Sequence, residues 1–418
     1  MKKVKGEIYL PGDKSISHRA ALFSSFVPEQ SVFTNYNFNN DCTATLTAIK
    51  EFGVNWYTKE DKLIIEGKPL RKWKNSGSII DAQNSGTTAR LISGLFANLP
   101  FEINMTGDDS LKRRPMARII EPLKKMGAKI MSNNGYLPLK FLPVEKLNGI
   151  LYKLPVASAQ IKSAVLLAGL FAEGQTEVVE YNNSRDHTER MLQLPSVVNE
   201  DGSKSIYSSR AIKVNNLSMQ IPGDFSSAAF YMCAALCLPG SELHFNNVSL
   251  NPSRIGLLNV MEQMGAKFEK KVNHEYPEPV GEIQINSSDL KNINIPLEIV
   301  PNIIDEIPIL CVLATQSEGR FLLRGAKELR VKESDRIATI VNNFRNLGIE
   351  IKEYEDGFEF VGPQQIKGGR VETQHDHRIA MAFTIAQLLT EDKIEIDDPE
   401  CVSVSFPDFY KILNSIVE

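Results

Sequence analysis

The sequence predicts an α/β protein with two domains, each made of three repeated α/β units whose inner helices are buried. Two observations carry this prediction. Six helical segments are apolar around their whole circumference, which is typical of helices buried on all sides. An amphipathic helix followed by two short strands accompanies most of them, so that one unit recurs along the chain. Six such units in 418 residues favour two hydrophobic cores over one.

The six apolar segments recur at a nearly constant distance. They span residues 19–26, 87–99, 162–172, 226–238, 307–315 and 378–389. One reference position was taken for each: Ser17, Thr87, Gln160, Ser226, Glu306 and His377. The spacings between these positions are 70, 73, 66, 80 and 71 residues. A period of this length indicates repeated supersecondary units.

The second recurring element is an amphipathic helix that ends in glycine. Four such helices end at Gly53, Gly127, Gly265 and Gly348. Glycine fits the left-handed position that commonly closes a helix. Two short strands follow each glycine, and alternating residues up to Gly362 predict a hairpin that turns at Asp356-Gly357. Residues 192–214 carry a degenerate copy of the same element.

The composition indicates a globular protein and argues against several functional classes. Hydrophobic residues make up 42% and charged residues 23%. The net charge of −4 argues against binding nucleic acid or a membrane surface, which usually requires a basic excess. We expect no membrane span and no signal peptide. Five cysteines without paired spacing predict reduced thiols and a cytoplasmic protein. Cys233 and Cys237 are expected in the core and not at a metal.

A polar cluster lies at or just before the start of each apolar segment. The clusters span residues 11–19, 83–90, 157–163, 221–227, 304–308 and 375–378. N-capping explains any one cluster, but it does not explain why Lys14, Arg19, Arg90 and Arg378 lie beside apolar helices. Because helix N-termini attract anions, the added cations predict a strongly charged ligand such as a phosphate or a carboxylate. Residues 12–15 lack the glycine spacing of a nucleotide-binding P-loop.

Two charged clusters lie outside the helix starts. The first, at residues 107–115, begins with glycine and contains two adjacent arginines; a solvated surface loop is an equal alternative. The second packs six charges into residues 328–336. If this segment enters a helix, Lys332 and Arg336 share one face at i and i+4. A salt-bridged exposed face is the alternative interpretation.

Taken together, four of these stretches resemble the motifs of one enzyme family. They read PGDKSISHR at 11–19, NSGTTAR at 84–90, RVKESDR at 330–336 and DHR at 376–378. In this order they resemble the 5-enolpyruvylshikimate-3-phosphate synthases, also called 3-phosphoshikimate 1-carboxyvinyltransferases. The similarity extends from Pro11 to Phe409, and several motifs in one order are more specific than any one of them.

The resemblance implies the fold of that family, an inverse α/β barrel type with two globular domains of three α/β units. Chain crossings near Gly12 and Pro222 would give a discontinuous domain of residues 1–12 and 223–418. The inserted domain would span residues 13–222. The helix N-termini of both domains would face a cleft that holds the substrates.

The resemblance also implies the reaction. The 5-hydroxyl of shikimate 3-phosphate attacks C2 of phosphoenolpyruvate while C3 is protonated, and the adduct then loses phosphate, in the pathway to chorismate and the aromatic amino acids. No metal and no organic cofactor are implied. The two substrates carry two phosphates and two carboxylates, so the site needs many cations. These two small molecules are the expected partners, without nucleic acid or membrane, and a monomer is expected.

The resemblance implies roles for single residues at the positions that match the motifs of the family. Asp305 would act as the base for the hydroxyl, and Glu333 and Lys14 are the candidates for proton transfer at C3. Shikimate 3-phosphate would contact Lys14, Ser15, Arg19, Ser158, Gln160, Ser184, Asp305 and Lys332. Phosphoenolpyruvate would contact Lys14, Asn84, Gly86, Arg114, Gln160, Arg336 and Arg378.

Three positions depart from the family pattern, and two alternatives stay open. Many members have serine at the position of Ala159, asparagine at Glu328 and lysine at Val404. One alternative is the related UDP-N-acetylglucosamine enolpyruvyl transferase, which places a reactive cysteine in the loop that matches residues 107–115, where this chain has none. The other is a non-catalytic anion-binding repeat protein, which would not need carboxylates beside the cation clusters.

Overall fold

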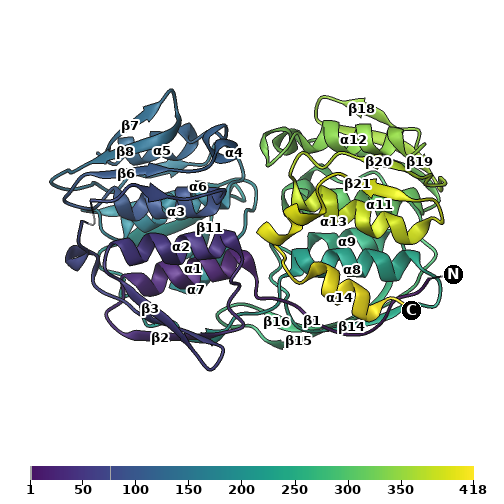
Figure 1. Cartoon of the computed structure of the whole chain (residues 1–418). Helices are drawn as coiled ribbons and strands as arrows, with labels where there is room; N and C mark the ends of the chain where they lie inside the picture. Colours follow the sequence, from purple (N-terminus) through teal and green to yellow (C-terminus); the bar gives the residue numbers. More distant parts are fainter. Residues whose placement is uncertain (1, 76) are drawn as a thin grey trace. The chain divides into compact units, whose positions relative to one another are not determined.

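The computed structural model describes residues 2–75 and 77–418, and the chain divides into two compact units (Figure 1). Unit 1 contains Met1–Pro11 and Pro222–Glu418, and unit 2 contains Gly12–Ile221. Each unit has its own buried hydrophobic cluster. Three small sheets are described in each unit, with helices packed on them, so the predicted α/β fold class is confirmed.

Unit 2 repeats one arrangement of helices and strands three times. Its inner helices are α1 (Lys14–Ser25), α3 (Gly86–Phe96) and α6 (Ala159–Gly169). The amphipathic helices are α2 (Asn40–Glu51), α5 (Ala117–Lys125) and α7 (His187–Leu192), and α4 (Asp109–Lys112) is a single turn. The first sheet has the order β13 (Met219–Gln220), β2 (Gln30–Thr34), β4 (Lys62–Glu66), β3 (Asn55–Lys59). The second has the order β5 (Ile80–Asp81), β6 (Ile103–Thr106), β8 (Tyr136–Leu142), β7 (Lys129–Asn133). The third has the order β11 (Ser196–Val198), β12 (Lys204–Ser209), β10 (Gln175–Glu180), β9 (Leu151–Lys153).

Unit 1 follows the same plan. Its inner helices are α8 (Phe225–Cys237), α11 (Ile307–Thr315) and α13 (His377–Ala386). The other helices include α9 (Gly256–Gln263), α10 (Val300–Ile303), α12 (Arg336–Asn346) and α14 (Phe409–Ile416), with 3-10 turns η3 (Lys327–Val331) and η5 (Pro399–Val404). One sheet has the order β1 (Lys5–Tyr9), β14 (Glu242–Ser249), β16 (Val280–Asn286), β15 (Lys267–His274). The others are β17 (Gly319–Leu323), β19 (Gly357–Gly362), β18 (Lys352–Tyr354), and the pair β20 (Gly369–Val371), β21 (Ile394–Ile396).

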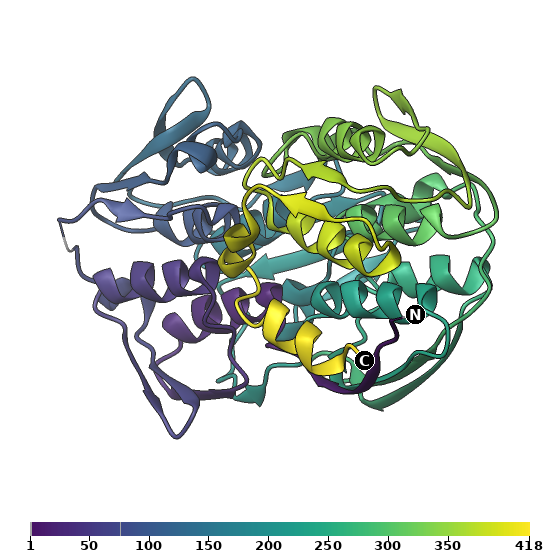
Figure 2. The same ribbon diagram turned by 45° about the vertical axis from the view of Figure 1, so that its right-hand side comes forward.

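The six apolar segments form the six inner helices, as predicted. All nine residues of α11 are buried, because this helix is apolar on every side. Helices α8, α11 and α13 pack against one another inside unit 1 (Figure 2). Helix α1 begins at Lys14, five residues earlier than the apolar segment indicates, because Asp13 accepts a hydrogen bond from the Ile16 amide and caps the helix there.

The glycine-ended helices are also confirmed. Gly53, Gly127, Gly265 and Gly348 have φ angles of +81°, +103°, +97° and +79°. In the degenerate copy Gln193 takes the left-handed position after α7, with a φ of +52°. A non-glycine residue adopts this region at a modest steric cost, which is why the glycine pattern does not reveal this copy.

The hairpin after Gly348 turns one residue earlier than predicted. Tyr354 pairs with Gly357 across the hairpin, so Glu355 and Asp356 form the turn. Gly357 is needed for a different reason: a Cβ atom there would lie 2.0 Å from the carbonyl oxygen of Leu323 on the neighbouring strand. The sequence pattern is the same for a turn glycine and for a glycine required by close packing.

Strand β1 joins the start of the chain to unit 1. It pairs in parallel with β14, with Lys5 opposite Glu242 and Tyr9 opposite Asn246. The amide of Asp224 then donates to the carbonyl of Pro11, which links the two segments of unit 1 where the chain passes into and out of unit 2. Among the described residues, no helix combines the length and hydropathy that crossing a bilayer requires.

Candidate active site

The predicted site residues of unit 2 lie at the starts of its inner helices and in two adjoining loops. We call this set the unit 2 half-site: Lys14, Ser15, Arg19, Asn84, Gly86, Arg114, Ser158, Gln160 and Ser184. Ser85 caps α3 and Ser158 caps α6, each accepting a hydrogen bond from an amide of the first turn. The predicted N-caps are therefore present, and the cations stand beside them.

Arg19 is buried, with 2% of its surface exposed, and three contacts hold it. Its Nε donates to Thr188 Oγ1 at 2.8 Å, its Nη2 to Ser163 Oγ at 2.9 Å, and its Nη1 to the Ser15 carbonyl at 3.0 Å. These acceptors come from α7, α6 and α1. The guanidinium therefore has a fixed orientation, which a flexible ammonium group would not share.

Lys14 pairs with an acidic residue that the sequence did not single out. Lys14 Nζ lies 3.0 Å from Asp41 Oδ2, and both side chains are largely buried. Asp41 stands in the first turn of α2, where an acidic residue is expected for helix stability alone. Because helix stability alone explains an acidic residue at this position, the sequence pattern does not indicate that Asp41 contacts Lys14.

The residues predicted to bind phosphoenolpyruvate in unit 2 share contacts. Arg114 is 8% exposed, and its Nη2 donates to Asn84 Oδ1 at 2.8 Å, whereas the adjacent Arg113 is exposed. Gly86 is the first residue of α3, and an added Cβ would lie 3.0 Å from Arg90 Nη1 and 3.5 Å from Arg114 Nη1. The absence of a side chain at Gly86 therefore leaves the space in front of these two arginines open.

Arg90 links α3 to α6. Its Nη1 donates to Gln160 Oε1 at 2.7 Å, and Gln160 Nε2 donates to Thr87 Oγ1 at 3.0 Å. Sequence reasoning noted Arg90 beside an apolar helix but assigned it no role in the site. Its contact shows that Arg90 orients the predicted ligand Gln160.

A buried chain of hydroxyls connects α1, α2 and α3 behind the half-site. His18 Nδ1 lies 2.7 Å from Thr45 Oγ1, which lies 2.6 Å from Thr88 Oγ1, and Thr88 Oγ1 donates to Ser85 Oγ at 2.8 Å. His18 is fully buried, and this burial lowers its pKa to about 3. The histidine is therefore neutral at physiological pH.

The predicted site residues of unit 1 form a second cluster, which we call the unit 1 half-site: Asp305, Lys332, Glu333, Arg336 and Arg378. Asp305 lies between α10 and α11. Its Oδ1 is 3.3 Å from Lys332 Nζ and 3.5 Å from Arg336 Nη1. Its backbone carbonyl accepts a hydrogen bond of 2.9 Å from Arg378 Nη1. Three predicted cations thus converge on the predicted base.

The predicted helical face at Lys332 and Arg336 is wrong. Asp335 caps α12 by accepting from the Ala338 amide, so the helix begins at Arg336 and Lys332 has an extended backbone. The two side chains nevertheless reach the same oxygen of Asp305. Arg330 of this segment pairs instead with Asp335 and with Glu353, each at 2.9 Å.

Arg336 is held by carboxylates on two sides. Its Nε donates to Asp376 Oδ2 at 2.8 Å and its Nη2 to Glu333 Oε2 at 2.7 Å. Burial acts to lower the pKa of Arg336, but the neighbouring carboxylates, Asp376 foremost, raise it above the usual value. Burial likewise acts to raise the pKa of Asp376, and Arg336 more than offsets this, so the Asp376 pKa is lowered. Both groups are charged.

Two further residues of unit 1 belong to this network. Asp376 is fully buried and also accepts from Ser334 Oγ at 3.0 Å. Arg254 is 2% exposed, and its Nη1 lies 3.9 Å from Asp305 Oδ2. Sequence reasoning treated Asp376 as a helix cap within a motif, and Arg254 carries no local signal, because its contact is made across the fold.

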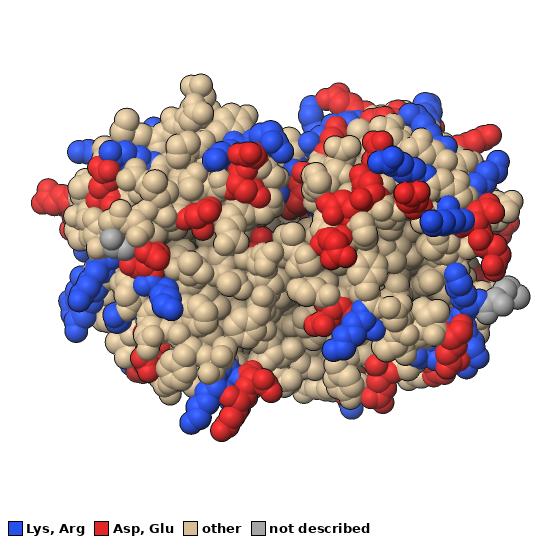
Figure 3. Space-filling model, viewed as in Figure 1, with Lys and Arg blue, Asp and Glu red and all other residues tan. Residues whose placement is uncertain are grey.

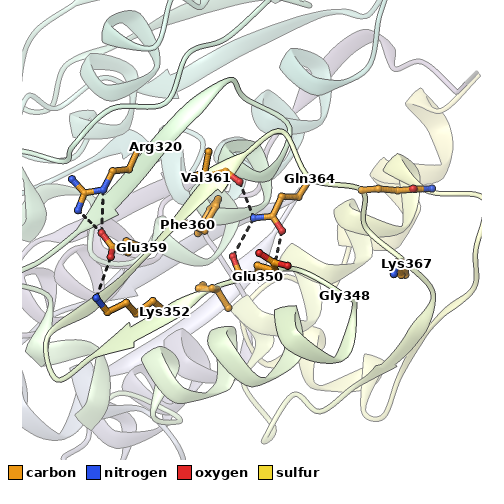
Figure 4. A pocket seen from close by; sticks show the side chains of 11 residues that line it. Arg320, Gly348, Glu350, Lys352, Glu359, Phe360, Val361, Gln364 and Lys367 are labelled. Carbon is orange, nitrogen blue, oxygen red and sulfur yellow. Dashed lines mark hydrogen bonds and ion pairs between the residues drawn. The ribbon is translucent and has the colours of Figure 1, made fainter.

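A surface pocket of about 760 Å³ lies elsewhere in unit 1 (Figure 4). It is lined by residues of β17, β18 and β19 and by residues that follow α12 and β19. Its charged groups engage one another: Glu359 accepts from Arg320 and lies 3.5 Å from Lys352. None of the predicted site residues lines it, so the chemistry places the candidate active site in the two half-sites and not in this pocket.

Solved structures define the class to which this fold belongs. The enolpyruvyl transferase NikO from Streptomyces tendae matches with a TM-score of 0.76, covering 100% of this chain and 96% of that one, at 12% identity. An EPSP synthase from Acinetobacter baumannii matches with a TM-score of 0.87 at 39% identity, covering 100% of this chain and 97% of that one. The fold is therefore that of the enolpyruvyl transferases.

Sequence comparisons then define the family. Residues 1–413 match the family model of EPSP synthase (3-phosphoshikimate 1-carboxyvinyltransferase). The 3-phosphoshikimate 1-carboxyvinyltransferase of Thermodesulfovibrio yellowstonii is 45% identical over 99% of this chain and 98% of that protein. The Bacillus subtilis protein of that name is 44% identical over 98% of this chain and 97% of that protein. The chain belongs to the EPSP synthase family, and the predicted family and the predicted transferase class are confirmed.

Proposed function

We propose that this chain transfers the enolpyruvyl group of phosphoenolpyruvate to the 5-hydroxyl of shikimate 3-phosphate and releases phosphate. The observation that carries this proposal is the identity of 45% with a 3-phosphoshikimate 1-carboxyvinyltransferase over nearly the whole of both chains. The contacts within each half-site support it, because each gathers cations and hydrogen-bond donors suited to phosphates and carboxylates.

The proposed binding roles divide between the two units. Shikimate 3-phosphate would contact Ser15, Arg19, Ser158, Gln160 and Ser184 of unit 2 and Asp305 and Lys332 of unit 1. Phosphoenolpyruvate would contact Asn84, Gly86, Arg114 and Gln160 of unit 2 and Arg336 and Arg378 of unit 1, with Lys14 serving both substrates.

The proposed chemistry begins with proton removal from the 5-hydroxyl. Asp305 accepts this proton, since Lys332 and Arg336 favour its carboxylate form. The hydroxyl oxygen bonds to C2 while C3 takes a proton from Lys14 or Glu333. Loss of a proton from the resulting methyl group expels phosphate and leaves the enol ether. The proton gained at C3 returns to the enzyme, the hydroxyl proton passes from Asp305 to the departing phosphate, and no net oxidation occurs.

Glu333 needs a proton before it can act as an acid. In this structure its Oε2 accepts from Arg336 at 2.7 Å, which favours the carboxylate form. Phosphoenolpyruvate would compete for Arg336 and bring negative charge close to Glu333, and both effects favour protonation. Substrate binding itself would thus prepare the acid.

The remaining assignments concern the setting of the protein. We propose a monomer that acts in the cytoplasm, with the two substrates as its partners. The five cysteines are free thiols, which fits a reducing compartment.

The purified protein should release phosphate only when shikimate 3-phosphate and phosphoenolpyruvate are both present. A coupled phosphate assay, with either substrate omitted in turn, measures this directly. Turnover with UDP-N-acetylglucosamine in place of shikimate 3-phosphate would replace the proposal with the cell-wall alternative. Binding of both substrates without turnover would favour the non-catalytic alternative.

A further inference from the structure

A buried charged cluster lies behind the unit 2 half-site. It consists of Lys162 of α6, Glu180 at the end of β10 and Glu189 of α7, whose exposed fractions are 0%, 3% and 5%. Lys162 Nζ lies 3.1 Å and 3.0 Å from the two oxygens of Glu180 and 2.7 Å from Glu189 Oε1. Lys204 Nζ adds a weaker contact, 3.8 Å from Glu189.

Stability alone does not account for these charges. The buried positions of helix α6 are apolar except for Lys162 and Ser163. Burying an ion pair is costly, and well-packed apolar replacements are often neutral or stabilising. We therefore expect the charged cluster to position another group.

The cluster holds Ser184, a predicted ligand of shikimate 3-phosphate. The amide and the hydroxyl of Ser184 both donate to Glu180 Oε2, at 3.3 Å and 2.7 Å. The carbonyl of Ser184 accepts from Lys162 Nζ at 3.5 Å. Both members of the ion pair thus contact the same residue and fix its position.

The hydroxyl of Ser184 cannot donate a hydrogen bond to Glu180 and to a phosphate at the same time. A serine hydroxyl has one proton to donate, and in this structure Glu180 receives it. Phosphate oxygens are acceptors, so the hydroxyl must rotate away from Glu180 to bind one. Ser158 has no such conflict, because its oxygen accepts from the Ile161 amide and leaves its proton available.

We propose that Lys162 is a positioning residue that allows the Ser184 hydroxyl to turn from Glu180 to the phosphate of shikimate 3-phosphate. Lys162 contacts both oxygens of Glu180, so this carboxylate stays compensated when the hydroxyl leaves. Lys162 also offsets a negative charge that would otherwise repel the incoming phosphate. This inference rests on the proposed function, since it takes Ser184 as a phosphate ligand.

The neighbouring residue extends the same arrangement. Ser163 accepts from Arg19 Nη2 at 2.9 Å, so consecutive residues of α6 hold two different predicted ligands of shikimate 3-phosphate. Ser158 lies at the start of the same helix. Helix α6, which also carries Gln160, therefore fixes four predicted ligands relative to one another.

The test compares binding of shikimate 3-phosphate by calorimetry in Lys162→Met, Glu180→Gln and the double variant Lys162→Met/Glu180→Gln. Lys162→Met should raise the Kd about tenfold or more while the KM for phosphoenolpyruvate changes less than about twofold. The double variant should recover most of the affinity, because residue 180, which accepts from the hydroxyl, then no longer carries a negative charge. A purely structural role predicts further loss in the double variant, and that result would overturn the proposal.

Two controls separate this inference from its premise. Leu123→Ala removes a fully buried side chain of α5 and should lower stability without changing the Kd. Ser184→Ala should raise the Kd, and adding Lys162→Met to it should change little. An unchanged Kd in Ser184→Ala would overturn the proposed ligand role and the inference with it. A raised Kd in Ser184→Ala together with an unchanged Kd in Lys162→Met would overturn the inference alone.

Discussion

The two half-sites are built from different chemical groups. The predicted ligands of unit 2 are cations, hydroxyls, amides and a glycine, and none of them is a carboxylate, although Asp41 and Glu180 each contact one of them. The unit 1 half-site contains two carboxylates, Asp305 and Glu333, each within 3.5 Å of a cationic nitrogen. On the surface drawn in Figure 3, by contrast, acidic and basic side chains are simply interspersed.

This difference indicates a division of labour. Groups that only attract and orient anions lower the energy of the bound substrate and of the transition state alike, whereas a group that moves a proton acts in the reaction step. Apart from Lys14, a candidate for proton transfer at C3, substitutions in the unit 2 half-site should therefore act mainly on KM or Kd. Substitutions of the carboxylates in unit 1 should act mainly on kcat.

The largest effect is expected from the carboxylates of unit 1. Asp305→Ala and Glu333→Ala should each lower kcat at least about a hundredfold, the usual scale for a positioned acid or base. Steady-state kinetics with both substrates measure it. Glu355→Gln, which removes an exposed carboxylate paired with Lys327 in the same unit, is the control and should keep kcat. Near-normal turnover of either alanine variant would remove that residue from the mechanism.

The next effect concerns Arg19 in unit 2. Arg19→Lys keeps the charge but loses the three-way contact with Ser15, Ser163 and Thr188. The Kd for shikimate 3-phosphate should rise about thirtyfold, a loss within the range of a charge-assisted hydrogen bond, and kcat should change far less. Arg71→Lys, a substitution at an exposed position of the same unit, is the control. A kcat defect larger than the Kd defect would contradict the division between the half-sites.

A third effect follows from the buried His18. Its pKa of about 3 in the folded protein lies below the ordinary value of 6.5, so the unfolded chain takes up the proton first as the pH falls. Stability is therefore lost below pH 6.5, by about 1.5 kcal/mol between pH 6.5 and 5. His18→Asn should flatten this part of the stability profile in denaturant titrations. His274→Asn, a substitution at an exposed position, is the control.

The smallest effect is expected at Gly86. In Gly86→Ala the new methyl group would lie 3.0 Å from Arg90 Nη1, so the guanidinium must shift by a few tenths of an ångström. Arg90 orients Gln160, and the space in front of Arg114 narrows as well. The KM for phosphoenolpyruvate should rise about fivefold, roughly 1 kcal/mol, with a smaller change in the Kd for shikimate 3-phosphate. Equal changes for both substrates would place Gly86 outside the phosphoenolpyruvate half of the site.

Much of the fold could be predicted because its signals are local. An all-round apolar segment such as residues 307–315 specifies a buried helix by itself. A glycine after an amphipathic helix specifies its end, as Gly127 does. Predictions were wrong where one sequence pattern has two possible causes. Gly357 is required by close packing and not by the turn. Asp335 caps the start of α12, so the helix begins after Lys332 and does not include it.

The residues missed in the site make contacts that the local sequence does not encode. Asp41 meets Lys14 from a helix start 27 residues away, and Lys162 meets Glu189 at the same separation. In a single sequence, Asp41 looks like a helix-stabilising acid and Lys162 like one charge in an apolar helix. Only the packing of α1 on α2 and of α6 near α7 brings each pair together.

The most direct test of the division of labour is a matched measurement on Glu333→Gln and Arg19→Lys. For both variants, the Kd of shikimate 3-phosphate is measured by calorimetry and the rate of phosphate release by rapid quench at saturating substrates. We predict that Glu333→Gln keeps its Kd within about twofold and loses at least about a hundredfold in rate. Arg19→Lys should show the reverse. Parallel losses of binding and rate in both variants would contradict the account.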